Sequence, residues 1–134
     1  MGGRGSSSGA NNNSAAKAMI TRIKEPTTKQ DFIDKMNVMA ELGNQQGVYN
    51  YKVKTTDWEN YGKSRTYLKI TETRASDGKP HGERDYGYFD NNSGKYVKSK
   101  ANNLDTPQFY NVGGNSVSNQ DLKNAVNAVI KRKK

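Results

Sequence analysis

The chain has 134 residues, the usual length of a single domain, and it contains no cysteine, which excludes disulfides, thiol nucleophiles and thiolate metal ligands. Hydrophobic residues make up only 31% of the chain and the formal net charge is +9, so we expect a small core and favour an anionic partner. No apolar run approaches the ~20 residues that a membrane helix needs, so we expect no membrane-spanning helix.

The N-terminal stretch MGGRGSSSGANNNSAA has low complexity and the composition of a flexible linker. It predicts a disordered tail over residues 1–17, followed by a single domain over residues 18–134. The stretch also lacks the apolar segment of a secretory signal peptide, so we expect an intracellular protein.

The residues GGRGSSSG, at positions 2–9, resemble the opening of small prophage proteins of Gram-positive bacteria, which are often encoded near head-morphogenesis genes. This resemblance implies a phage origin, and it places the protein in the cytoplasm of the bacterial host or in the virion. It implies nothing about mechanism.

A first helix is predicted shortly after Pro26, because Thr28 and Asp31 have the spacing of a capping box. The apolar residues that follow recur at helical spacing and are expected to face the core: Phe32, Ile33, Met36, Met39 and Ala40. Polar residues of the same helix are expected to face away: Asp34, Lys35 and Asn37. Gly43 or Gly47 is expected to end the helix.

Strands are predicted from alternating apolar and polar residues at 48–54, 65–74, 83–90 and 95–100, with a fifth at 108–112. Residues 55–64 are expected to form a loop or wide turn, and residues 75–82 consist of turn-forming residues.

A last helix is predicted after Ser118 and Asp121. Its apolar stripe comprises Leu122, Ala125, Val126, Val129 and Ile130. We therefore expect an α+β fold, in which an antiparallel sheet of four to five strands carries an N-terminal and a C-terminal helix on one face.

The hairpin GERDYGYFDNNSGKYVK, residues 82–98, decides which tyrosines are exposed. A three-residue loop at 92–94, with Gly94 in the left-handed conformation, would pair Phe89 with Val97 and Tyr88 with Lys98. A two- or four-residue loop would instead shift the pairing by one residue and place Val97 beside Tyr88.

With the three-residue loop, uniform alternation divides the sheet into two faces. The face that the helices cover would hold Tyr51, Val53, Leu68, Ile70, Phe89 and Val97, with Glu72 and Asp85 at its margins. The open face would hold Lys52, Lys54, Arg65, Tyr67, Lys69, Arg84, Tyr86, Tyr88, Tyr96 and Lys98.

An open face with many cations and rings predicts nucleic-acid binding, because rings stack on bases while lysine and arginine contact phosphates. The stacking residues would be Tyr67, Tyr86, Tyr88 and Tyr96, and the phosphate contacts Lys52, Lys69, Arg84 and Lys98. Two alternatives stay open: a solvated sheet face stabilised by Tyr–Lys pairs, and a protein-interaction module such as a virion accessory protein or an inhibitor of a host defence complex.

A third hypothesis is a small metal-independent ribonuclease, in which His81 and Glu83 would act as acid and base beside the cation of Arg84. Alternation, however, places Glu83 and Arg84 on opposite faces of their strand. We therefore favour a protein without enzymatic activity. One histidine and no cysteine also predict neither a metal site nor a cofactor.

Overall fold

A computed structural model describes residues 6–105 and 117–133, with side chains from residue 14 onward. Three helices are present in these ranges: α1 (Ser6–Lys24), α2 (Lys29–Asn44) and α3 (Asn119–Arg132). The strands are β1 (Tyr49–Asn60), β2 (Lys63–Arg74), β3 (Pro80–Asp90) and β4 (Lys95–Val97), and they form one antiparallel sheet in the order β1-β2-β3-β4. The predicted α+β class is confirmed.

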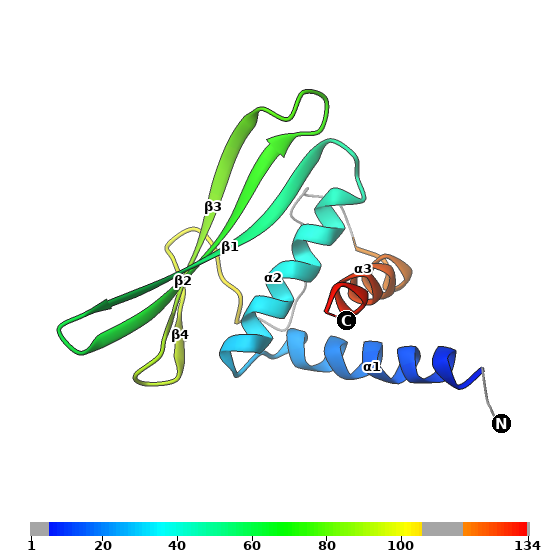
Figure 1. The fold of residues 1–134 in the computed structure, drawn as a ribbon, viewed down its shortest axis with the longest axis horizontal. Coiled ribbons are helices and arrows are strands. Elements are labelled where there is room, and N and C mark those ends of the chain that lie inside the picture. The colour runs from blue at the N-terminus through cyan, green and yellow to red at the C-terminus, as the bar shows by residue number, and fades with distance from the viewer. Residues whose placement is uncertain (1–5, 106–116, 134) are drawn as a thin grey trace.

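The fold has three layers, with every helix on the same side of the sheet (Figure 1). α2 packs directly on the sheet and closes a first core around Phe32, Met36, Leu68 and Ile70. α3 packs on α2 and α1, where its predicted stripe forms a second core; within the described residues it is therefore a further layer behind α2. Two small cores suit a chain with few apolar residues, because α2 serves both.

The N-terminal segment is consistent with the predicted disordered tail, since the described side chains of α1 that pack in a core begin at Ala16. Ala16, Met19 and Ile23 are buried against α2 and α3 at the spacing of one helix face. The helix is held by this tertiary packing, which a composition rich in Gly, Ser and Asn does not reveal. Residues 1–5 lie outside the described residues.

α2 begins with the predicted capping box, since the Thr28 side chain and the Asp31 carboxylate each accept from the other's backbone. The prediction that Asp34 and Lys35 face away is wrong, because α2 is covered on two sides. The Asp34 carboxylate, 1% exposed, binds Lys133 of the C-terminal end at 2.7 Å. Lys35 donates from Nζ to the Leu104 carbonyl at 2.9 Å, and burial, opposed by Asp105, lowers the pKa of Lys35 to about 8.

The predicted loop at 55–64 is also wrong. β1 and β2 stay paired to Asn60 and Lys63, so only Tyr61 and Gly62 form the turn. Both turn residues have positive φ, 49° and 79°. The resulting long hairpin reaches past the helices at the lower left of Figure 1.

The predicted fifth strand at 108–112 lies outside the described residues. Across 6–105 and 117–133, none of the helices has the length and apolarity to cross a membrane.

Candidate nucleic-acid interface

The loop between β3 and β4 has four residues, because Asp90 pairs with Lys95, Phe89 with Tyr96 and Tyr88 with Val97. The Asp90 carbonyl accepts from the Gly94 N–H at 2.8 Å, and its carboxylate accepts from the Asn92 N–H at 2.9 Å. The predicted three-residue loop is therefore wrong, and the alternative with Val97 beside Tyr88 is the one observed. Tyr96 turns toward the helices, while Val97 turns away from them.

A β-bulge in β3 changes the two faces a second time. The pairing shifts between Tyr67–Tyr88 and Lys69–Asp85, so that Tyr86 and Gly87 together oppose Leu68. An extra residue reverses the alternation along the rest of the strand. Arg84 and Tyr86 therefore lie on the helix side, and Glu83 and Asp85 lie on the open side.

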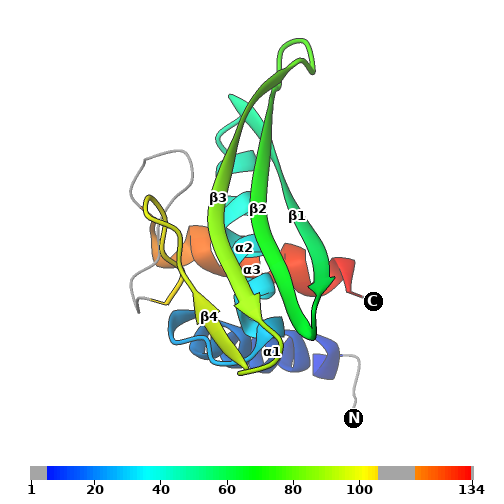
Figure 2. The same cartoon turned by 90° about the vertical axis from the view of Figure 1, so that its left-hand side faces the viewer.

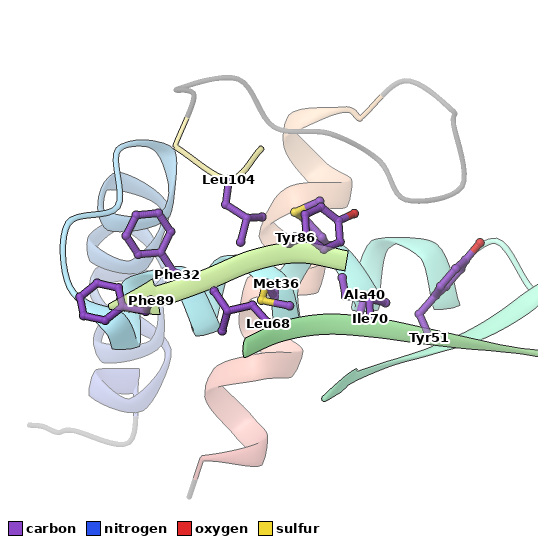
Figure 3. Packing of buried hydrophobic residues seen from close by; sticks show 10 residues of the cluster. Phe32, Met36, Ala40, Tyr51, Leu68, Ile70, Tyr86, Phe89 and Leu104 are labelled. Atoms are coloured by element: carbon purple, nitrogen blue, oxygen red, sulfur yellow. The ribbon is translucent and has the colours of Figure 1, made fainter. Parts of the chain in front are cut away.

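Tyr86 and Tyr96, both predicted to stack on bases, belong to the first core. Tyr86 is 4% exposed, and Figure 3 places its ring on the side of the sheet that faces α2. Tyr96 stacks on Phe32 at 4.5 Å between ring centroids and donates its hydroxyl to the Tyr86 carbonyl. Burial raises the pKa of both phenols, against opposing hydrogen bonds from Arg84 and from Leu104. Their predicted placement on the open face is wrong.

Arg84 and Lys98, which were also predicted on the open face, lie in two different places. Arg84 lies on the helix side, where its Nε donates to the Glu72 carboxylate at 3.0 Å, so the predicted open-face position is wrong. Lys98 is exposed but follows the last residue of β4, so it belongs to neither face of a strand.

The open face of the sheet lies in front of the helices in Figure 2. It carries an aromatic cluster toward the end of the β1–β2 hairpin. We use this name for Trp58, Arg65, Tyr67 and Tyr88, which sit side by side on β1, β2 and β3. The Arg65 guanidinium lies 4.4 Å from the Tyr88 ring centroid and 5.3 Å from that of Trp58. Arg65 also donates to the Tyr67 hydroxyl at 3.2 Å, and the Tyr67 and Tyr88 centroids are 5.4 Å apart. One guanidinium therefore contacts three rings.

Charges around the aromatic cluster are unevenly distributed. Cations of the open face lie on β1 and β2: Lys52, Lys54, Lys63 and Lys69. Acids lie on β3: Glu83, Asp85 and Asp90. Lys69 binds Glu83 at 3.1 Å, so part of the positive charge is compensated. Asp85 was predicted at the margin of the covered face, and the bulge moves it to the open one. An anionic strand would therefore be attracted along β1 and β2.

The predicted catalytic pair is separated, since Glu83 faces the open side while His81 meets Glu72 on the other. Glu72 accepts from His81 Nδ1 at 2.8 Å, and His81 stacks on Tyr49 at 4.4 Å. Burial would raise the pKa of Glu72, but the hydrogen bonds from His81 and Arg84 outweigh it and lower that pKa. These side chains line a pocket of about 200 Å³ beside the end of α2. The Glu72 carboxylate orients the His81 imidazole, as carboxylates do in acid–base sites. The predicted partner of His81, Glu83, takes no part in this arrangement.

Of the eight predicted binding residues, the structure keeps four on the open face: Lys52, Tyr67, Lys69 and Tyr88. The site prediction missed Trp58, because its segment was taken for a loop, and it placed Arg65 on the face without giving it a role. A signal was present in Gly62, because glycine is typical of the second position of a two-residue hairpin turn.

Comparisons with protein-family models, curated proteins and solved structures found no match to the chain. In the part of the chain that the structure describes, His, Asp and Glu side chains form no group of three that could hold a metal ion. The geometry of the open face is therefore the feature that indicates a function.

Proposed function

We propose that this protein binds single-stranded nucleic acid through the open face of its sheet. The observation that carries the proposal is the aromatic cluster, in which three rings gather around Arg65 on a face that no described helix covers. Aromatic rings on a sheet stack with bases of any sequence, at about 1–3 kcal/mol per base, and arginine adds cation–π attraction. A single strand suits such a face better than a duplex, whose bases are already stacked.

The cluster is organised before any ligand arrives. Arg65 holds Tyr67 by a hydrogen bond and lies over Tyr88, so the rings lose little freedom when a base stacks on them. Lys52 and Lys54 continue along β1 from the cluster, and both are exposed. They are placed to contact phosphates on one side of the bound bases, which makes binding salt-dependent.

A protein partner is the competing occupant of this face, because Trp, Tyr and Arg are also enriched in protein–protein hot spots. The positive charge of β1 and β2, together with the net charge of +9, favours a phosphate backbone. A protein-interaction module of phage origin remains the alternative that the binding experiment must exclude.

The chain has a single tryptophan, Trp58, which makes a direct measurement possible. We expect a single-stranded oligonucleotide to quench Trp58 fluorescence and to raise its own anisotropy, with affinity falling as salt rises from about 50 to 200 mM. Tyr88→Ala should weaken binding about tenfold through loss of one stacking ring. Tyr49→Ala, on the helix side of the sheet, is the matched control and should bind like the wild type.

Unchanged anisotropy at micromolar protein and about 50 mM salt would reject nucleic-acid binding. Equal binding of Tyr88→Ala and the wild type would instead place the site elsewhere. Gel analysis of an RNA oligonucleotide after the titration tests the ribonuclease hypothesis at the same time, since we expect the RNA to stay intact.

A further inference from the structure

Tyr61, at the tip of the β1–β2 hairpin, combines full exposure with a rare backbone conformation. Its side chain is 95% exposed, the most of the large hydrophobic residues described. Its φ of 49° lies in the left-handed region, and Tyr61 is the one described non-glycine residue with positive φ. The disfavoured backbone opposes folding, and the exposed ring gains no burial that would offset this cost.

The turn itself does not require tyrosine. Two-residue hairpin turns with positive φ at both positions prefer Asn-Gly or Gly-Gly, because those residues tolerate the left-handed region. Gly62 fits its position, whereas Tyr61 stands where asparagine is preferred. Strain that the fold does not need is found preferentially at functional sites. The tyrosine ring is therefore the feature to explain.

The surroundings of Tyr61 give the hairpin tip two chemically different sides. On the side of the open face, Trp58, Lys63 and Arg65 precede and follow the turn. On the opposite side, Asp57 and Glu59 are exposed. A nucleic acid would be attracted to the first side and repelled by the second, which directs a bound strand from the aromatic cluster toward the tip.

We propose that Tyr61 is a further stacking residue, which contacts a base of the same single strand beyond those held by the aromatic cluster. The inference rests on the proposed function and deepens it. Tyr61 is three positions beyond Trp58, which places its Cα about 10 Å further along the hairpin. Lys63 lies next to the turn and would contact the phosphate on the 5′ or 3′ side of that base.

The test compares Tyr61→Asn with the wild type over a series of oligonucleotides of increasing length. For the longest oligonucleotides, we expect Tyr61→Asn to bind about tenfold more weakly, because one stacked base is lost. For the shortest ones that still quench Trp58, the two proteins should bind equally. Tyr61→Phe, which keeps a ring, should bind like the wild type at every length.

The stability of Tyr61→Asn distinguishes a role of Tyr61 in binding from a role in folding. Tyr61→Asn should unfold at a higher urea concentration than the wild type, since asparagine suits the left-handed turn. Weaker binding by a more stable variant cannot be attributed to misfolding. Equal affinity of Tyr61→Asn and the wild type at every length overturns the Tyr61 proposal, while Tyr88→Ala, measured beside it, still reports on the aromatic cluster. Absence of binding by the wild type overturns both.

Discussion

Gly87 decides which side chains reach each face of the sheet. It lies in the bulge of β3 with φ of 97°, and a Cβ added to it would overlap the carbonyl oxygen of Val97 on β4. Glycine therefore permits both the backbone conformation and the close approach of the neighbouring strand. The bulge in turn buries Tyr86 and brings Arg84 to Glu72.

We expect Gly87→Ala to lower the free energy of unfolding by about 3 kcal/mol or more, because strain and overlap with backbone act together. Gly78→Ala is the matched control: Gly78 also has positive φ, 72°, but nothing lies within 4 Å of an added Cβ. Its cost should be about 1 kcal/mol. Urea denaturation of both variants gives the comparison, and equal costs would show that the contact with β4 is unimportant.

At the scale of elements, α1 is the helix whose sequence least resembles one. Its buried apolar residues, Ala16, Met19 and Ile23, form a narrow stripe, and their partners are Val38 and Leu42 on α2 and the stripe of α3. Such a helix depends on its neighbours, since its intrinsic propensity is low. α1 also contributes Arg22, which lies 3.5 Å from the Asp31 carboxylate.

Ile23 tests whether α1 is part of the cooperative fold. It is 0% exposed, so Ile23→Ala should cost about 2–5 kcal/mol of unfolding free energy through lost burial and a cavity. Lys17→Ala, on the exposed side of α1, should change stability by less than about 0.5 kcal/mol. If both substitutions were neutral in urea denaturation, α1 would not be packed as described.

At the scale of the whole molecule, the layers explain how a chain with few apolar residues folds and still leaves one sheet face open. α2 is buried on two sides, and the charged groups enclosed there are paired, as with Asp34 and Lys133. All apolar layers lie on one side of the sheet (Figure 1). The opposite face is thereby free to carry the aromatic cluster and its lysines.

The ionisation of Glu72 makes the stability of the folded protein depend on pH. Its pKa is lowered in the folded protein from an ordinary value of 4.5, so its contribution is complete above about pH 4.5 and is lost as the pH falls through the lower folded value. We expect Glu72→Gln to be less stable than the wild type at neutral pH, and this difference to shrink on acidification below about pH 4.5. Glu59→Gln, at the exposed hairpin tip, should show no such change. A difference between Glu72→Gln and the wild type that stays constant with pH in urea denaturation would contradict the assignment.

The sequence by itself determined the elements with strong local patterns. Thr28 with Asp31 and Ser118 with Asp121 begin their helices as predicted, and the apolar stripes of α2 and α3 lie in the cores. These signals are local, since a cap or a stripe depends on residues three or four apart.

Only the tertiary structure decided which face each residue of β3 and β4 occupies. A single extra residue at Gly87 and one more residue in the loop before Lys95 reverse the faces, and both depend on pairing between strands. The packing of α1 is also a tertiary feature, because its apolar residues are buried against α2 and α3. Lys35 is likewise buried through a contact distant in sequence, with the carbonyl of Leu104. The aromatic cluster follows the same rule, because Trp58, Arg65 and Tyr88 are distant in sequence and meet through the register of three strands.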